Sequence, residues 1–376
     1  MNLALFFTCN VSLKLWLETG LFDREKQLYE EHLRSGHLGK VYWLTYGAED
    51  AEIASELKAA GRLHQDIVVL PMARFLPGHW GCLLYSFLMP LLRRRWLKSA
   101  DIFKTNQMDG SWSAVVAKWL YHKPLIVRTG YTASLFAERQ TNVESKRNYE
   151  RIERFAYRHA DIGIVASHRD KQYICSKYHV PPAKIEVLHN YVNTAVFHPT
   201  DCEKYENRII FVGRLQPQKN LFNLIEAVSD NNLTLDIYGS GELYDELLAH
   251  AKKLDAKVNF MGVVPNNEMP AVLNRYRYCI LPSFYEGMPK ALLEAMACGL
   301  VCIGTDVEGI NQIIEDGVNG YLARGTAPQA LAEAINKAAQ LPNDHIMQEA
   351  VRRIRDGFSL QIVAEQENEI IAGLRK

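Results

Sequence analysis

The sequence predicts an α/β protein with two doubly wound, Rossmann-like domains that face a central cleft. Short apolar runs, typical of buried parallel strands, alternate with helical patterns along almost the whole chain. The 376 residues exceed what a single core usually holds, and the strand–helix pattern restarts after residue 197. We therefore expect an N-terminal domain over residues 1–197 and a C-terminal domain over 198–358. The last segment, 359–376, is expected to be helical, and its return to the first domain is one alternative.

The apolar runs that we expect to form strands are short and are bounded by polar or glycine-containing turns. In the first domain they are 3–7, 41–45, 67–70, 102–104, 125–128, 162–165 and 185–188. In the second domain they are 209–212, 233–238, 258–260, 278–281 and 301–304, and they alternate with helices near 221–229, 243–254, 268–276, 290–298 and 327–340. Because ligands of such sheets bind outside the carboxyl ends of the strands, we look for functional residues in the loops that follow them.

The composition is that of a soluble globular protein and gives no sign of a nucleic-acid partner. Lys and Arg together number 43 and are balanced by 43 Asp and Glu residues, whereas nucleic-acid-binding domains are typically basic. Seven scattered cysteines form no paired framework, so we expect reduced thiols in a cytosolic protein. Residues 1–7 lack the basic start of a secretory signal and are better explained as a first buried strand. We therefore predict a cytoplasmic location.

The segment 285–299 is the most informative part of the chain because it places two carboxylates around one apolar helix. Pro289 occupies a first helical position, Gly299 a C-terminal cap, and Glu294 is the one acidic residue between them. Glu286 precedes the helix N-terminus, whose free N–H groups attract anions. A buried carboxylate needs hydrogen-bond donors, and sugar hydroxyls are suitable ones. The alternative is a capped surface helix with one exposed glutamate.

Two cations follow the strand expected at 209–212, at a strand-to-helix turn. Gly213 lets the backbone pass close to a ligand. Arg214 offers a planar fork to phosphate oxygens and Lys219 adds a point charge, a combination that suits a diphosphate. Solvent-facing loop residues are the alternative. The Tyr-Gly-Ser-Gly segment at 238–241 is half of a dinucleotide fingerprint and fits a tight β–α turn as well as a ligand contact.

The chain contains none of the common motifs for metal-assisted or nucleophilic catalysis. No two aspartates are separated by a single residue, the arrangement expected if a divalent ion held a nucleoside diphosphate. No HExxH, P-loop or Gly-x-Ser-x-Gly pattern occurs either. We therefore expect no metal and no cofactor, and we predict that cationic side chains assist the departure of a diphosphate.

Several motifs occur in a fixed order in the second half of the chain. They are Phe211-Val212-Gly213-Arg214-Leu215, Lys219-Asn220, Ile237-Tyr238-Gly239-Ser240-Gly241, Met261-Gly262-Val263-Val264, Pro282-Ser283-Phe284-Tyr285-Glu286-Gly287 to Ala297-Cys298-Gly299, and Gly317-Val318-Asn319-Gly320-Tyr321. In these motifs the chain resembles the donor domain of glycosyltransferase family 4, retaining enzymes of the GT-B fold that use nucleotide-sugars. The resemblance extends back through 158–161 and 187–193, whereas residues 1–120 resemble the family only in their strand–helix alternation.

The resemblance implies a role for each matching residue. Arg214 and Lys219 would hold the diphosphate, and Glu286 would bind hydroxyls of the transferred sugar; these three are the implied catalytic residues. Glu294 would accept hydrogen bonds from the ribose, and the backbone of Val264 would frame the base. The N–H groups of Gly287, Met288 and Lys290 would surround sugar and phosphate, and Gly213 completes the implied donor site.

The first domain departs from the pattern of the family at two places. The first turn reads Thr8-Cys9-Asn10-Val11-Ser12, where the family commonly has a glycine-rich loop. The strand expected at 125–128 leads into Arg128-Thr129-Gly130-Tyr131, where the family commonly has a histidine. We therefore consider Asn10, Arg128, Tyr131 and Asn190 as candidates for contacts with the donor or the acceptor.

The implied activity is retaining, metal-independent transfer of a hexose-type sugar from a UDP- or GDP-sugar. The acceptor would be a hydroxyl of a glycan or of a lipid-linked molecule, in the synthesis of a cell-surface polysaccharide or glycolipid. In the front-face mechanism of the family the leaving phosphate takes the proton of the acceptor; a double displacement with Glu286 as the nucleophile is the alternative. Two other functions stay open, a GT-B nucleotide-sugar epimerase and a non-catalytic envelope-assembly protein of the same fold.

Residues 75–98 join an apolar helical pattern to a basic cluster. Trp80, Leu83, Leu84, Phe87, Leu88, Leu91 and Leu92 recur at helical spacing and precede Arg93-Arg94-Arg95-Trp96-Leu97-Lys98. One interpretation is an interfacial helix on the anionic cytoplasmic face of a membrane. The other is a core helix of the first domain whose basic residues favour its C-terminus. The charge-free part of this segment, 75–92, is interrupted by Pro77, Gly78 and Pro90 and is too short to span a bilayer comfortably.

Overall fold

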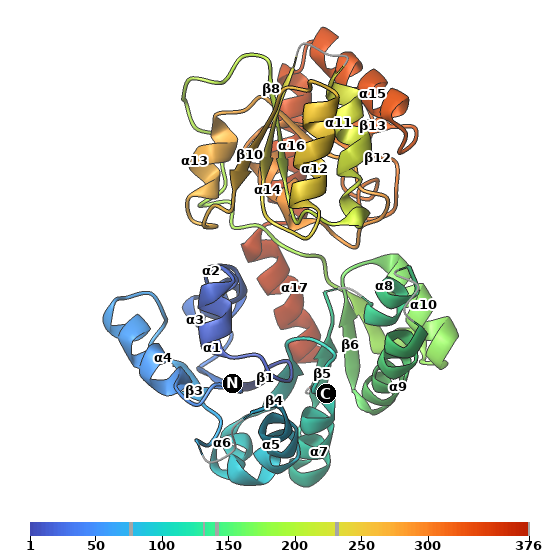
Figure 1. Ribbon diagram of the computed structural model, residues 1–376. Helices are drawn as coiled ribbons and strands as arrows, with labels where there is room; N and C mark the ends of the chain where they lie inside the picture. Colours follow the sequence, from blue (N-terminus) through green and yellow to red (C-terminus); the bar gives the residue numbers. More distant parts are fainter. Residues whose placement is uncertain (75–77, 131, 140–142, 230–232, 375–376) are drawn as a thin grey trace. The chain divides into compact units, whose positions relative to one another are not determined.

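The computed structural model describes residues 1–376 except 75–77, 131, 140–142, 230–232 and 375–376. The chain divides into two compact units, Met1–His189 with Ala364–Lys376, and Asn190–Val363. Each unit is a parallel sheet with helices on both sides (Figure 1), which confirms the predicted fold class. The N-terminal unit is therefore built from both ends of the chain.

The sheet of the N-terminal unit has seven parallel strands in the order β3-β2-β1-β4-β5-β6-β7. Their bounds are β1 (Asn2–Phe6), β2 (Lys40–Leu44), β3 (Ile67–Leu70), β4 (Ile102–Thr105), β5 (Leu125–Arg128), β6 (Ile162–Val165) and β7 (Ile185–Val187). Each lies within one residue of a run that the sequence predicted. β1 pairs with both β2 and β4. The strand order therefore reverses between β1 and β4, and such a switch point is where doubly wound sheets bind ligands.

The helices of this unit lie on both sides of the sheet (Figure 1). They are α1 (Leu13–Glu18), α2 (Phe22–Glu25), α3 (Gln27–Arg34), α4 (Asp50–Ala59), α5 (Gly78–Leu92), α6 (Arg94–Ser99), α7 (Ser111–Tyr121), α8 (Ala133–Arg139), α9 (Val143–His159), α10 (His168–Tyr178), the short 3₁₀ turn Pro182–Lys184, and α17 (Leu360–Gly373) from Ala364 onward. An aromatic cluster fixes α1 and α3 on the sheet: Trp16 stacks on Phe7 at 4.3 Å between ring centroids, and both Trp16 and Tyr29 form T-shaped pairs with Trp43. No helix among the described residues is long and apolar enough to cross a membrane.

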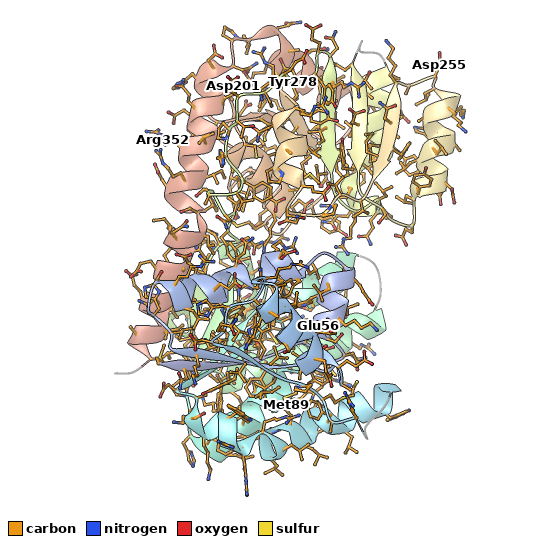
Figure 2. All side chains as sticks on the ribbon, turned by 90° about the vertical axis from the view of Figure 1, so that its left-hand side faces the viewer. Glu56, Met89, Asp201, Asp255, Tyr278 and Arg352 are labelled. Atoms are coloured by element: carbon orange, nitrogen blue, oxygen red, sulfur yellow. The ribbon has the colours of Figure 1, made fainter. Side chains whose placement is uncertain are left out.

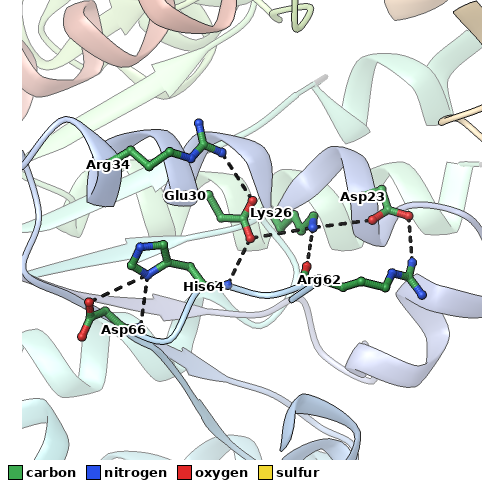
Figure 3. A network of polar contacts seen from close by, with 7 residues as sticks. All are labelled: Asp23, Lys26, Glu30, Arg34, Arg62, His64 and Asp66. Atoms are coloured by element: carbon green, nitrogen blue, oxygen red, sulfur yellow. Dashed lines mark hydrogen bonds and ion pairs between the residues drawn. The ribbon is translucent and has the colours of Figure 1, made fainter. Parts of the chain in front are cut away.

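A polar network joins α2 and α3 to the loop that leads into β3 (Figure 3). Lys26 donates to the carbonyl oxygen of Arg62, and its ammonium lies 3.7 Å from Glu30. Glu30 in turn accepts from the backbone N–H of His64 at 3.2 Å, and Arg62 pairs with Asp23 at 3.1 Å. Exposed ion pairs of this kind each contribute little, but Lys26 and Glu30 are largely buried. The network therefore fixes α2 against the body of the unit.

The C-terminal helix is held in this unit by a buried ionic network. Lys104 of β4 and Glu367 of α17 are both fully buried and lie 2.5 Å apart. His32 of α3 donates to the other carboxylate oxygen of Glu367 at 3.0 Å. Burial alone would raise the pKa of Glu367, but Lys104 and His32 hold that pKa well below its usual range.

The C-terminal unit has six parallel strands in the order β10-β9-β8-β11-β12-β13, with a switch point between β8 and β11. The strands are β8 (Arg208–Val212), β9 (Thr234–Tyr238), β10 (Val258–Gly262), β11 (Tyr278–Leu281), β12 (Val301–Thr305) and β13 (Tyr321–Ala323). The helices are α11 (Leu221–Ser229), α12 (Tyr244–Lys253), α13 (Met269–Asn274), α14 (Lys290–Ala297), α15 (Pro328–Gln340), α16 (Asp344–Gly357) and the first residues of α17, with a 3₁₀ turn at Pro217–Lys219. The sequence did not predict β13, which is too short to show a strand pattern, or α16.

Candidate active site

The loops after β8 and β11 meet at the switch point of the C-terminal sheet. The backbone N–H of Phe284 donates to the carbonyl oxygen of Gln218 at 2.9 Å. Asn220, in the left-handed conformation with φ of 55°, donates from its side chain to the carbonyl oxygen of Pro282 at 3.0 Å. A second bond from the same amide reaches the carbonyl oxygen of Thr326 at 2.8 Å. These bonds fix the two loops on which the predicted cations and carboxylates lie.

Lys219 and Glu286 form an ion pair across these loops. The ammonium nitrogen lies 2.5 Å from Oε1 of Glu286, and the two side chains are 13% and 7% exposed. The same oxygen accepts from the hydroxyl of Ser283 at 2.6 Å, and the amide of Gln218 lies 3.4 Å from the other oxygen. The fold therefore joins two predicted site residues that are 67 positions apart in the sequence. Sequence reasoning missed Gln218 and Ser283 as their partners, although Ser283 lies inside a quoted motif and Gln218 directly precedes another.

Arg214 lies at the end of β8 with its side chain exposed. Among the residues that the structure describes, the guanidinium has no hydrogen-bond or ion-pair partner, so all its donors face solvent. An exposed planar cation at a strand end, on the same loop as Lys219, suits an incoming phosphate.

The glycines at 239 and 241 have a packing role. A Cβ at Gly239 would lie 1.9 Å from the carbonyl oxygen of Gly213, and one at Gly241 would lie 2.3 Å from that of Leu215. The backbone of the β9 loop thus runs directly against that of the β8 loop, with a hydrogen bond of 2.9 Å from Leu215 to Ser240. A tight β–α turn explains both glycines, and the Tyr-Gly-Ser-Gly segment needs no ligand contact to account for it.

Glu294 is buried on α14. The helix begins at Lys290, so Pro289 is its extended N-cap, one residue before the first helical position that the sequence predicted, and Gly299 follows the helix in the left-handed conformation with φ of 75°. Most of its side chains are buried, Glu294 among them, so the alternative of a surface helix with one exposed glutamate is wrong. Asn266, which the sequence did not single out, lies 3.3 Å from the Glu294 carboxylate. Burial, with Glu294 nearby, raises the pKa of the Cys298 thiol to about 12, so this cysteine is an unreactive thiol.

The loop that supplies the predicted backbone donors is held from two sides. Asn190 is buried and donates to the carbonyl oxygen of Met288 at 2.8 Å. A Cβ at Gly309, which has φ of 88°, would lie 2.3 Å from the carbonyl oxygen of Gly287, so the loop after β12 packs directly on this backbone. Lys290 extends its ammonium over the Tyr191 ring at 4.8 Å. Asn190 therefore positions the loop that carries the N–H groups of Gly287 and Met288, and it does not face an open site.

The remaining predicted residues lie at other strand ends. Val264 is half-buried in the loop after β10. In the N-terminal unit, Asn10 is exposed after β1 with φ of 63°. Arg128 is buried at the end of β5, where its backbone N–H donates to the Thr105 hydroxyl at 3.1 Å. Tyr131 lies outside the described residues.

A pocket of about 280 Å³ opens at the switch point of the N-terminal sheet. Its walls come from the loops after β1 and β4 and from α1 and α2: Thr8, Val11, Leu15, Trp16, Thr19, Leu21, Arg24, Glu25, Asn106 and Gln107. A larger pocket of about 410 Å³, bordered by Lys118 and Pro124, lies at the amino end of β5. Because ligands of parallel sheets bind at the carboxyl edge, the smaller pocket is the better candidate site. Its position after two predicted strands was the signal that could have found it.

The described residues contain no group of three or more His, Cys, Asp or Glu side chains placed to hold a metal ion.

Two family profiles match this chain in succession. Residues 26–196 match the profile described as Glycosyltransferase Family 4, and residues 192–354 match the one described as Glycosyl transferases group 1. Together they span residues 26–354. The chain belongs to glycosyltransferase family 4. The sequence-based identification is thus confirmed, including residues 26–120, where the sequence motifs alone did not carry it.

Curated relatives of this family member are glycosyltransferases of different specificity. It is 28% identical over 280 residues to a UDP-Gal:alpha-D-GlcNAc-diphosphoundecaprenol alpha-1,3-galactosyltransferase of Escherichia coli, covering 69% of this chain and 72% of that protein. It is 24% identical over 330 residues to an alpha-D-kanosaminyltransferase of Streptomyces kanamyceticus, covering 78% and 83%. Other relatives are matched over 57, 52 and 50% of their own length.

Solved structures show the same fold. An Anabaena protein crystallised with UDP and glucose superposes with a TM-score of 0.74 at 18% identity, over 99% of this chain and 100% of that one. A lipopolysaccharide outer core galactosyltransferase superposes with a TM-score of 0.69 at 19% identity, over 99% and 100%. This family member therefore has the GT-B fold of two Rossmann-like units.

Proposed function

We propose that this glycosyltransferase moves a hexose from a UDP-sugar to a hydroxyl of a glycan or lipid-linked acceptor, with retention of configuration and without a metal ion. The observation that carries the proposal is the arrangement at the β8/β11 switch point. Lys219 and the exposed Arg214 lie on the loop after β8, and Glu286, the ion-pair partner of Lys219, lies on the adjoining loop that leads into the N-terminus of α14. UDP is favoured over GDP because the Escherichia coli relative is named for UDP-Gal and the Anabaena structure holds UDP.

The chemistry requires stabilisation of the leaving diphosphate. As the bond between the anomeric carbon and the phosphate oxygen breaks, negative charge grows on the diphosphate. Arg214, Lys219 and the free N–H groups at the start of α14 would meet that charge without reorganising. The acceptor oxygen forms the new bond on the same face, and its proton passes to the departing phosphate oxygen. The sugar therefore keeps its configuration, and no side-chain base is needed.

The surroundings of Glu286 favour a binding role over a nucleophilic one. Its carboxylate is neutralised by Lys219 and accepts from Ser283 and Gln218. Each of these donors stabilises the charge that a nucleophile would have to give up, so attack on the anomeric carbon is disfavoured. The free lone pairs can still accept from hydroxyls of the transferred sugar. We therefore place Glu286 as a sugar-binding carboxylate and Glu294 as the acceptor for the ribose hydroxyls.

The pocket of the N-terminal unit would receive the acceptor. Leu15, Trp16 and Leu21 offer apolar contacts, while Asn106 and Gln107 offer amides that can bind hydroxyls. An aromatic ring beside amides is suited to the apolar face and the rim hydroxyls of a sugar. This combination supports an acceptor that presents a hydroxyl on a partly apolar body.

A panel of nucleotide-sugars tests the donor. We expect UDP-hexoses to raise the thermal unfolding midpoint more than GDP-hexoses, because a ligand at one hundred times its Kd stabilises the folded state by about 2.7 kcal/mol. Transfer is then measured as UDP release with glycan and lipid-linked hydroxyl acceptors. Epimerised donor formed without any acceptor would show an epimerase instead, and binding with no turnover in either assay would contradict an enzyme.

Chelation provides an independent prediction about the mechanism. We expect EDTA to leave the rate of sugar transfer essentially unchanged, because Arg214 and Lys219 supply the positive charge that a divalent ion would otherwise bring. The measurement is initial velocity before and after dialysis against chelator. A rate that vanishes on chelation and returns with Mg²⁺ or Mn²⁺ would contradict this prediction.

A further inference from the structure

The helix α5 buries one face and exposes an apolar one. Tyr85 and Met89 are fully buried, and Figure 2 labels Met89 on this helix. On the other face Trp80 is 81% exposed, Phe87 54% and Leu91 57%, and these residues follow one another at helical spacing. Neither sequence-based interpretation was complete, because the helix is both a core element and an exposed apolar surface. Its predicted start at 75–77 lies outside the described residues.

A row of cations continues this surface at the C-terminal end of α5. Arg94, Arg95 and Lys98 of α6 are exposed. Arg93 is not part of the row: it donates to the carbonyl oxygen of Pro71 and lies 3.4 Å from the Tyr85 hydroxyl. The predicted basic cluster is thus divided into one residue that fixes the fold and three that face solvent.

The neighbouring helix α7 widens the apolar surface and adds no negative charge. Trp112 stacks on Phe87 at 6.2 Å between centroids, and Leu120 is exposed. Tyr121 donates to the carbonyl oxygen of Pro90 at 2.6 Å and so holds α7 beside α5. None of the sequences of α5, α6 and α7 contains an aspartate or glutamate.

We propose that this α5–α6 surface, made of Trp80, Leu84, Phe87, Leu91, Leu92, Arg94, Arg95 and Lys98, binds an anionic lipid bilayer. Exposed aromatic and leucine side chains beside cations are the composition of a helix that lies in the membrane interface. Contiguous exposed apolar surface marks an interaction site. A second copy of this chain would bring the same surface, which has no carboxylate to pair with the cations. Anionic lipid headgroups supply the negative charge that can pair with Arg94, Arg95 and Lys98.

Vesicle binding tests the proposal without reference to catalysis, so its outcome is independent of the proposed function. We expect the protein to sediment with vesicles of equal parts phosphatidylglycerol and phosphatidylcholine and to dissociate from them at high salt. It should not sediment with vesicles of pure phosphatidylcholine. The emission of exposed Trp80 should shift to the blue on binding. Each cation near an anionic surface contributes a factor of about five, so Arg94→Gln, Arg95→Gln and Lys98→Gln together should lower affinity on the order of 100-fold.

Two matched variants keep the test specific. Lys253→Gln, Arg352→Gln and Arg355→Gln remove the same charge from exposed positions of the C-terminal unit and should leave vesicle binding unchanged. Trp80→Gln with Leu91→Gln should weaken binding, whereas Leu341→Gln with Ile362→Gln, which changes two exposed apolar residues elsewhere, should not.

Three results would overturn the proposal. One is equal binding to neutral and anionic vesicles, and another is binding to neither. The third is a dimer in analytical ultracentrifugation without lipid that Trp80→Gln and Leu91→Gln abolish, which would assign the surface to a second copy.

Discussion

Lys219→Ala and Arg214→Ala should each lower kcat by about 100- to 1000-fold while the fold stays intact. This is the range measured when one preorganised charge contact to a transition state is lost. The charge on the diphosphate is larger in the transition state than in the bound donor, so we expect the loss in kcat and only a small change in KM. The assay is initial-velocity transfer over a range of UDP-sugar concentrations.

The two residues should differ in their effect on stability. Arg214 is exposed and has no partner among the described residues, so Arg214→Ala should leave the unfolding midpoint unchanged. Lys219→Ala removes the cation beside Glu286 and leaves that carboxylate with Ser283 and Gln218, so a modest loss of stability should accompany the loss of activity. Lys337→Ala is the matched control, because Lys337 forms an exposed ion pair with Asp316 at 3.1 Å in the same unit. A folded double variant that transfers sugar at the normal rate would disprove the diphosphate assignment.

The sequence predicted the backbone frame of the proposed donor site well because that frame is local. A proline at a helix start, a glycine after its end and a glycine after a strand each act within a few residues, and each lies within one residue of its predicted position. The order of the strands then follows from the rules of doubly wound sheets. Residues that share a strand end or a helix start can therefore be assigned to one edge of the sheet from the sequence alone.

Contacts between distant segments could not be predicted in the same way. The pairing of Lys219 with Glu286 depends on two loops that only the folded sheet brings together. Arg93 turns inward because it donates to the carbonyl oxygen of Pro71, and the periodicity of the sequence does not indicate this contact. Lys104 was predicted only as the end of a buried strand, and nothing local indicates that its charge meets a carboxylate 263 residues later.

Glu367→Ala should destabilise the N-terminal unit by about 3–5 kcal/mol. The change leaves the Lys104 ammonium fully buried without its counter-charge, and removal of one partner from a buried ion pair has a cost of about this size. All six tryptophans, at positions 16, 43, 80, 96, 112 and 119, lie in this unit. Urea denaturation followed by tryptophan fluorescence therefore reports the stability of this unit.

Two controls separate a buried charge from the loss of helix contacts. Glu367→Leu combined with Lys104→Met replaces the pair by apolar side chains of similar size, and it should recover most of the lost stability because no unpaired charge remains. Glu52→Ala breaks the exposed pair with Arg74 in the same unit and should cost about 1 kcal/mol or less. If the double variant is as unstable as Glu367→Ala, the helix owes its position to packing and the ion pair is incidental.

Acid should remove the stability that the Lys104–Glu367 ion pair contributes to the folded protein. Burial opposes the ionisation of Glu367, but Lys104 and His32 outweigh it and lower the pKa of this carboxyl in the folded state. A carboxyl with a depressed folded pKa contributes stability that is complete above its unfolded pKa, about 4.3, and that declines as the pH falls below it. The apolar double variant has no such group. We therefore expect the stability of the native protein, measured relative to that of the double variant, to fall steadily between about pH 5 and pH 3. A difference that instead rises as the pH falls over this range would show that Glu367 is protonated in the folded protein.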